Sequence, residues 1–349
     1  MSGGKTGGAS VDELLGESRF AALGGGRRLH YRLLSAGADA QEPADPERPI
    51  VVWVAGMGMS GLYWAPLHRR LGTDACLGAS ASVIYDRAGL GRSDDDEGSR
   101  TLERMARDLL ALLDELEAGA GPGAGARDGS GAAGSSESPS AMDAPGSPPA
   151  ARRFVLVGHS WGGPIARVAA SLAPERVAAL LLVDPSDEHL RETLLLAPNR
   201  RSRPGPALQR LARRLQLRGL PRAAAQGFGF ETSVLRELRE RELVPRAHRA
   251  NEAEFACFDA ELDALLASPP VLEGIPVTLL SGARPARSAR ARVRREAMTA
   301  AHELSATADP ALRLVRAERS GHLVNLSEPE LVLLELATLI SRSAEGGSS

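Results

Sequence analysis

Short, uninterrupted apolar segments recur along the chain, and helix-like segments separate them. Segments of this length without polar alternation are typical of strands that are buried on both faces of a sheet. Strands that alternate with helices predict an α/β fold, in which a mostly parallel sheet carries helices on both faces. The predicted strands are residues 50–56, 82–86, 154–158, 177–184, 276–282 and 311–317, and the predicted helices are residues 62–72, 102–117, 163–173, 287–306 and 328–342.

The N-terminal region has a different pattern. Residues 1–17 are rich in glycine, serine and acidic side chains, and we expect them to be disordered. Two short extended segments follow at 18–23 and 28–34, and three consecutive glycines lie between them. Such a pattern predicts a β-hairpin, which would add an antiparallel edge to the sheet.

Two segments interrupt the alternation of strands and helices. Residues 118–150 contain no Val, Leu, Ile, Phe, Trp or Tyr, so they cannot bury enough apolar surface to offset the entropy of ordering, and we expect a disordered insertion. Residues 185–268 are Arg-rich and mostly helical in pattern, and we expect a helical cap over the sheet. The core of the domain would then comprise residues 18–184 and 269–343.

The expected cap is the region that would decide the substrate. Its residues 206–220 form an amphipathic pattern with leucines on one face and arginines around it. Such a helix can serve as a lid with a solvated face or lie on a membrane surface. Four phenylalanines in the cap hint at an apolar pocket, and they are Phe228, Phe230, Phe255 and Phe258.

Composition excludes several classes of function. The 349 residues carry 42 Lys and Arg against 44 Asp and Glu, and 3% are aromatic, which argues against nucleic acid as a partner. The two cysteines, Cys76 and Cys257, are read as free thiols because they form no disulfide framework or metal cluster. No secretion signal or long apolar run is evident, so we expect a cytoplasmic protein without stable membrane insertion. We expect no metal and no cofactor, and the oligomeric state stays open.

A serine lies between two glycines at the end of one predicted strand. Residues 158–162 read Gly-His-Ser-Trp-Gly and fit the pattern G-x-S-x-G, with a strand before it and a helix after it. Glycines are needed because side chains near Ser160 would collide in such a tight turn. The turn would expose the Ser160 hydroxyl above the sheet edge, which predicts a nucleophile.

A serine nucleophile requires a base. His159 is the neighbour of Ser160, but its side chain should point away from the serine and pack against the core. His322 follows the last predicted strand and precedes the last helix. That loop would lie at the carboxyl ends of the parallel strands, where ligands bind in open α/β sheets. We therefore expect His322 to be the base.

Four segments of the chain together resemble the α/β-hydrolase superfamily. They read VVWVAGMG, VIYDRAGLGRSD, VLVGHSWGG and SGHLVNLSEPELV, and they begin at residues 51, 83, 155 and 320. The resemblance implies an eight-stranded sheet with a cap after the sixth strand. The second segment resembles an esterase and peroxidase-like branch, in which Asp86 and Arg87 would form structural hydrogen bonds. Ser160 also differs from the aspartate that epoxide hydrolases and dehalogenases of this fold carry at the turn.

The chain departs from the family pattern at two places. The family usually has His-Gly after the third strand, and this chain has Ala55-Gly56. The backbone N–H groups of Met57 and Trp161 could still form an oxyanion hole, because backbone donors do not depend on the missing imidazole.

The second departure concerns the acid that orients the base. No carboxylate follows the seventh strand, where the family most often places it, until Glu296. Asp184 ends the sixth strand instead, an arrangement that resembles some lipases, and it could orient His322. Asp187, Glu188 and Glu296 remain alternatives.

These residues predict a serine hydrolase that acts through a Ser160–His322–Asp184 triad and an acyl-enzyme. The substrate would be an ester or a similar acyl bond in a small, apolar molecule. The same triad could serve perhydrolase, lyase or carbon–carbon hydrolase chemistry. The chain could also be a hydrolase fold that only binds a small molecule.

Overall fold

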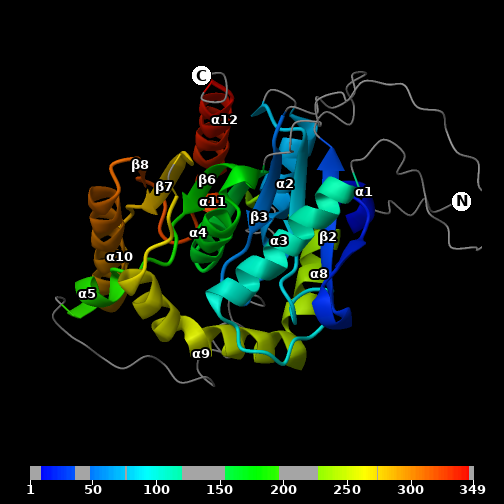
Figure 1. The fold of residues 1–349 in the computed structure, drawn as a ribbon, viewed down its shortest axis with the longest axis horizontal. Coiled ribbons are helices and arrows are strands. Elements are labelled where there is room, and N and C mark those ends of the chain that lie inside the picture. Colours follow the sequence, from blue (N-terminus) through cyan, green and yellow to red (C-terminus); the bar gives the residue numbers. More distant parts are fainter. Residues whose placement is uncertain are drawn as a thin grey trace, which may run out of the picture.

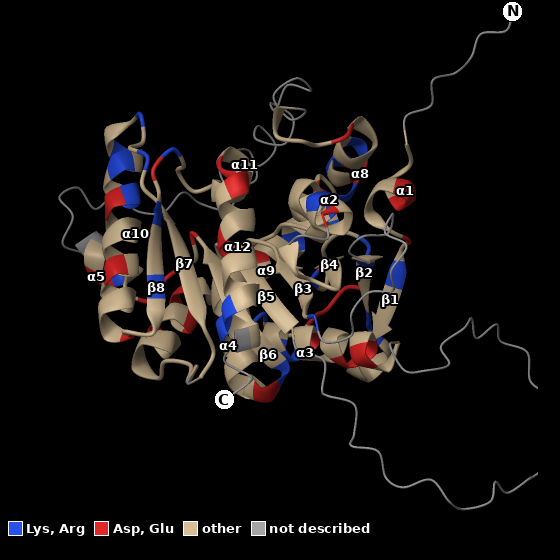
Figure 2. Ribbon diagram, turned by 90° about the horizontal axis from the view of Figure 1, so that it is seen from above, with Lys and Arg blue, Asp and Glu red and all other residues tan. Residues whose placement is uncertain are grey.

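The computed structural model describes residues 9–35, 48–74, 77–119, 154–195, 227–272 and 274–345. Within them the strands form one eight-stranded sheet in the order β1-β2-β4-β3-β5-β6-β7-β8, which can be followed from edge to edge in Figure 2. The strands are β1 Arg19–Ala22, β2 Arg28–Ser35, β3 Ile50–Val54, β4 Ala81–Tyr85, β5 Phe154–His159, β6 Val177–Val183, β7 Val277–Gly282 and β8 Leu312–Ala317.

The sheet is mostly parallel, as the sequence predicts. Each neighbouring pair from β4 through β3, β5, β6 and β7 to β8 is parallel. The β1–β2 hairpin forms the antiparallel edge, and β2 joins β4 antiparallel with Tyr31 opposite Tyr85. Because the central strands run parallel, the turns that follow them all lie at one end of the sheet.

Helices cover both faces of the sheet. On one face, α3 (Leu102–Ala118) and α4 (Gly162–Leu172) pack on strand residues that include Val52 and Leu156. On the other face, α2 (Ala65–Thr73) and α12 (Pro329–Glu345) pack on the neighbouring positions, which include Trp53 and Val157. Successive strand residues thus serve opposite faces, which explains the uninterrupted apolar segments. Helices α10 (Ala289–Ala308) and α11 (Val324–Ser327) complete the core.

The N-terminal segment differs from the expectation of disorder before residue 18. Residues Val11–Leu15 form the short helix α1. Ser10 and Glu13 form a reciprocal capping box, which satisfies backbone donors at the helix start, and Leu15 is fully buried. The expectation is wrong for this segment, because a cap and one buried side chain order it.

The segment between β6 and β7 contains the helices α5 (Leu190–Leu195), α8 (Thr232–Glu242) and α9 (Pro245–Ala267); we call α8 and α9 the inserted helices. Figure 1 shows α9 extending along one end of the sheet. Their function as a cap remains a prediction. The amphipathic stretch at 206–220, Cys76, and residues 120–150 of the predicted insertion lie outside the described residues.

Candidate active site

The turn between β5 and α4 holds Ser160 in a left-handed conformation, with φ of 52°. The two flanking glycines make this turn possible. A Cβ atom on Gly158 would lie 2.5 Å from the Gly162 carbonyl oxygen, and one on Gly162 would lie 2.2 Å from the Val54 oxygen. Both distances are far below van der Waals contact, so neither position accepts a side chain.

Backbone hydrogen bonds fix the turn further. The Ser160 N–H donates to the Val183 oxygen at 3.2 Å, and the Ser160 carbonyl accepts from Gly163 at 3.1 Å and from Ser186 at 2.9 Å. A conformation that costs a non-glycine residue about 1–3 kcal/mol is thereby held by its surroundings.

Ser160, His322 and Asp184 form a hydrogen-bonded chain, although 138 residues separate the last two in sequence. His322 Nε2 lies 3.1 Å from Ser160 Oγ, and His322 Nδ1 lies 2.7 Å from Asp184 Oδ2. The carboxylate can only accept, so Nδ1 carries the proton and Nε2 is free to accept from the serine hydroxyl. The His322 side chain is 47% exposed, whereas that of Asp184 is fully buried.

Asp184 follows the last residue of β6, and its φ of 42° is also left-handed. Its Oδ1 accepts from the Gly282 N–H at 2.9 Å, and its Oδ2 accepts from Arg295 Nη1 at 2.6 Å. Burial raises the pKa of Asp184, but the hydrogen bond to His322 and the charge of Arg295 hold it well below its usual value. The carboxyl group therefore stays ionised near neutral pH. Arg295 is a site residue that no local sequence pattern marks.

The other three candidate acids are engaged elsewhere. Asp187 accepts from Ser305 Oγ at 2.6 Å, and Glu188 forms a two-pronged ion pair with Arg167. Glu296 is on α10, where it lines a separate cavity of about 270 Å³. Of the four candidates, the structure brings Asp184 into contact with His322.

The loop after β3 lies directly beside the serine. A Cβ atom on Gly56 would be only 3.3 Å from Ser160 Cβ, so a larger residue would crowd the turn. Met57 is the next residue of this loop, and Trp161 is the residue after Ser160. Their backbone N–H groups belong to the two segments that meet at the serine. Their function as oxyanion donors is a prediction.

The comparisons with known proteins agree with this architecture. The sequence matches the group described as the alpha/beta hydrolase family over residues 51–335. The chain belongs to this family. It is also 30% identical over 163 residues to the "Putative carbamate hydrolase RutD" of Azorhizobium caulinodans, a match that covers 47% of this chain and 43% of that protein. The chain thus matches less than half the length of this relative.

Solved structures of other alpha/beta hydrolases superpose over almost the whole chain. The epoxide hydrolase CorEH has a TM-score of 0.56 at 17% identity and covers 93% of this chain and 99% of its own. An esterase from Thermogutta terrifontis has a TM-score of 0.54 at 19% identity and covers 94% and 99%. At such identities the likeness shows the fold alone, and the site chemistry has to be argued from the residues.

His159 fills the space behind the candidate base. Its ring lies 4.8 Å from that of His322, and its Nε2 donates to the His322 carbonyl oxygen at 2.9 Å. Burial lowers the pKa of His159 to about 3, so it is a neutral packing residue at this alpha/beta hydrolase turn. The packing agrees with the expectation from the sequence, and the contact with the His322 loop is an additional finding.

The Asp86 and Arg87 side chains form buried hydrogen bonds, as the resemblance implies. Asp86 accepts from the Gly61 and Arg92 N–H groups and from His30 Nδ1. Arg87 donates to the carbonyl oxygens of the loop after β3. Both residues thus shape the segments beside the site.

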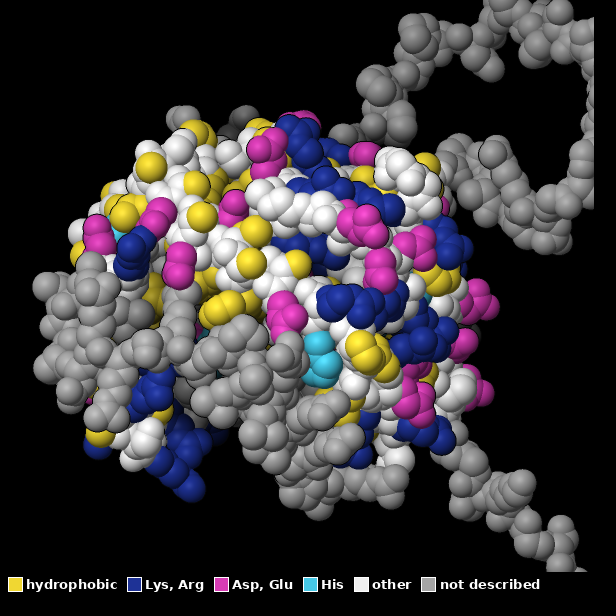
Figure 3. All heavy atoms as spheres, turned by 90° about the horizontal axis from the view of Figure 1, so that it is seen from below, with side chains coloured by type: hydrophobic (Ala, Val, Ile, Leu, Met, Phe, Trp, Pro, Cys, Tyr) yellow, Lys and Arg dark blue, Asp and Glu magenta, His cyan; other side chains and the backbone are white. Residues whose placement is uncertain are grey.

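Among the described residues, no group of three His, Cys, Asp or Glu side chains could hold a metal ion. In the same part of the chain, the helices are too short or too polar to span a membrane. Figure 3 shows basic and acidic side chains interspersed over one face. A cavity of about 550 Å³ is lined by α2, the segment before α8 and the α11–α12 turn, and its lining does not include Ser160.

Proposed function

We propose that this alpha/beta hydrolase is a serine hydrolase that cleaves an ester or a similar acyl bond. The hydrogen-bonded chain from Ser160 through His322 to Asp184 is the observation that carries the proposal. Ser160 Oγ attacks the acyl carbon while His322 Nε2 takes the hydroxyl proton. The bond to the leaving group breaks, and its oxygen receives that proton from His322. Water then attacks the acyl-enzyme with His322 again as base, and the acid is released.

The negative charge on the tetrahedral intermediate needs donors that are already in position. The backbone N–H groups of Met57 and Trp161 would supply them, and a missing donor of this kind costs about 100- to 1,000-fold in rate. Buried, ionised Asp184 would orient His322 and stabilise its imidazolium form. No step in this cycle requires a metal or a cofactor.

An apolar cluster of aromatic side chains next to the Ser160 turn favours a small, apolar acyl substrate. The Trp161 ring lies 4.9 Å from the Phe258 ring, and Phe258 stacks on Phe255 at 6.3 Å. The likeness to a carbamate hydrolase adds carbamates to the candidates, since a carbamate is cleaved at the same kind of carbonyl carbon. The test panel should therefore pair each short-chain ester with the matching carbamate.

A fluorophosphonate probe tests the proposal directly. We expect the probe to label the wild-type protein at Ser160, as read by mass spectrometry, and to fail on Ser160→Ala and His322→Ala. Ser186→Ala is the matched control, because this serine is a sequence neighbour of Asp184 and touches the site through its backbone N–H. A folded wild type without label would favour a binding protein. Labelling without ester or carbamate turnover would favour perhydrolase, lyase or carbon–carbon hydrolase chemistry.

A further inference from the structure

A buried carboxylate from the inserted helices reaches the loop after β3. Glu254 lies in the middle of α9 and is 1% exposed. Its Oε2 accepts from the Gly58 N–H at 2.7 Å, and its two oxygens pair with Arg87 Nε and Nη2 at 2.8 and 2.9 Å. Charged hydrogen bonds of this kind are about twice as strong as neutral ones.

Arg87 extends this contact to the next peptides of the loop. Its Nη1 donates to the Ala55 oxygen at 2.6 Å, and its Nη2 donates to the Gly56 oxygen at 2.8 Å. The Gly56 carbonyl and the Met57 N–H belong to one planar trans peptide and point in opposite directions. Holding the Gly56 oxygen therefore fixes the direction of the Met57 N–H. Ala55 stands where the family usually has histidine, and Arg87 braces the loop at this point.

The same helix also contacts the second predicted oxyanion residue. Phe258 follows Glu254 by four positions, so both side chains lie on one face of α9. The Phe258 ring is 4.9 Å from the ring of Trp161. One face of α9 thus touches both segments that would form the oxyanion hole.

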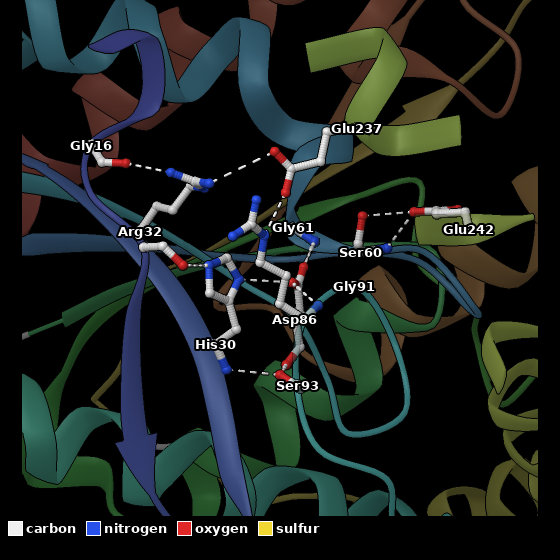
Figure 4. Close-up of polar contacts among 12 residues, drawn as sticks. Gly16, His30, Arg32, Ser60, Gly61, Asp86, Gly91, Ser93, Glu237 and Glu242 are labelled. Carbon is white, nitrogen blue, oxygen red and sulfur yellow. Dashed lines mark hydrogen bonds and ion pairs between the residues drawn. The ribbon is translucent and has the colours of Figure 1, made fainter. Parts of the chain in front are cut away.

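The other inserted helix holds the far end of the loop. Glu242, the last residue of α8, is fully buried and accepts from both the N–H and the hydroxyl of Ser60 at 2.7 Å. The next residue, Gly61, donates to Asp86 at 2.8 Å. Figure 4 shows these two carboxylates meeting the loop from different elements. The loop is therefore held between the sheet core and the inserted helices.

We propose that Glu254 is a positioning residue for the oxyanion hole, which acts through Arg87 on the Met57 N–H, so that the hole forms only while α9 is docked. This proposal rests on the proposed function for its effect on the rate. The docking contact itself can be tested without catalysis.

Hydrogen exchange tests the contact in the whole protein. In Glu254→Gln we expect backbone amides in residues 55–61 to exchange at least about tenfold faster, because the loop opens more often. Glu261→Gln is the matched control, since Glu261 is also on α9 and accepts from a core amide, Leu102 N–H at 2.7 Å, but does not touch the loop. Equal exchange in wild type and Glu254→Gln would overturn the proposal.

Steady-state kinetics tests the consequence. Glu254→Gln should lower kcat by about 10- to 100-fold, which is less than the loss expected when an oxyanion donor is removed entirely. Its KM should stay within about threefold of the wild-type value. Affinity for a trifluoromethyl ketone, which forms a tetrahedral oxyanion on the serine, should fall by the same factor. Glu261→Gln should keep the wild-type values. An unchanged kcat in Glu254→Gln would also overturn the proposal.

A double variant separates positioning from simple destabilisation. Glu254→Gln leaves the buried Arg87 charge unpaired, which can by itself lower stability. Arg87→Met combined with Glu254→Gln removes both charges, so stability should recover while loop exchange stays fast and kcat stays low. Recovery of kcat together with stability contradicts a positioning role. If the wild type takes no fluorophosphonate label, the proposed function fails, and the exchange comparison still decides the docking contact.

Discussion

The turns after β5 and β6 and the loop after β3 lie at the same end of the sheet, but different forces hold them. The first two place Ser160 and Asp184 at positive φ. Glycines and backbone hydrogen bonds hold the turn at Ser160, whereas the Asp184 side chain is held by the Gly282 N–H and by Arg295. The loop after β3 depends on buried side-chain charges, chiefly the Arg87–Glu254 pair. The turn at Ser160 should therefore be sensitive to added volume and altered backbone, whereas the Asp184 side chain and the loop after β3 should be sensitive to the loss of a single charge.

The largest effect should come from the acid at the strained turns. Asp184→Asn removes the charge that orients His322 and leaves Arg295 without its carboxylate partner. We expect kcat to fall by roughly 10³- to 10⁴-fold, as expected when the orienting acid of a triad is lost. Ester turnover by Asp184→Asn should be compared with Asp187→Asn and Glu296→Gln. Full activity in Asp184→Asn, with a loss in either of the others, would mean that the acid is assigned to the wrong residue.

The next largest effect should come from the Arg87–Glu254 ion pair, which holds the loop after β3. Arg87→Met removes the partner of buried Glu254 and two donors to loop carbonyls. An uncompensated buried charge costs about 3–5 kcal/mol of unfolding free energy, which urea titration would measure. Arg107→Met is the control, because that arginine forms an exposed pair with Glu103 and should cost under about 1 kcal/mol. Similar losses in the two variants would mean that the buried Arg87–Glu254 pair contributes no more to stability than an exposed pair.

A buried neutral histidine at the turn should make stability depend on pH. Burial lowers the pKa of His159 to about 3 and that of His68 to about 4. Between about pH 6.5 and 4, the unfolded chain binds a proton at each histidine and the folded protein does not. As the pH is lowered through this range, the unfolding free energy should therefore decrease by about 1.4 kcal/mol per pH unit for each histidine.

The variant His159→Gln isolates the contribution of His159 to this pH dependence. The slope of unfolding free energy against pH near pH 5 should decrease by the amount that corresponds to one bound proton. The variant His68→Gln should give the same decrease at a site away from the serine. An unchanged slope in His159→Gln would show that this histidine is protonated in the folded protein.

The smallest effect concerns the strain at the serine. Glycine adopts positive φ at no steric cost. The free energy of unfolding of Ser160→Gly should therefore be about 1 kcal/mol higher than that of Ser160→Ala. Both variants lack the hydroxyl, so the comparison isolates the backbone. Equal midpoints in thermal unfolding would mean that the turn carries no measurable strain.

The sequence predicts the sheet and the strained turn at Ser160 because their signals are local. Uninterrupted apolar segments mark the strands, and Gly158, Ser160 and Gly162 lie within one turn. The predicted β-hairpin is confirmed for the same reason. The helix at Val11–Leu15 also has a local signal, since Ser10 and Glu13 have the spacing of a capping box, but the composition of residues 1–17 does not reveal it.

The supports of the site could not be predicted in the same way. Arg295 reaches Asp184 across 111 residues, and Glu254 reaches Arg87 across 167. Both belong to segments with many charged side chains, and nothing in the local pattern distinguishes them. Only the packing of α9 and α10 against the sheet brings these particular charges to the site.

The spacing of Glu254 and Phe258 on α9 also bears on how such enzymes can be re-engineered. Inserted segments are attractive modules to exchange when a new substrate range is wanted. Here a transplanted segment would need a carboxylate and an aromatic side chain four positions apart, at the right depth over β3 and β5. Exposed α9 positions such as Asp263, which pairs with Arg191 outside the core, are the places where variation is free of that requirement.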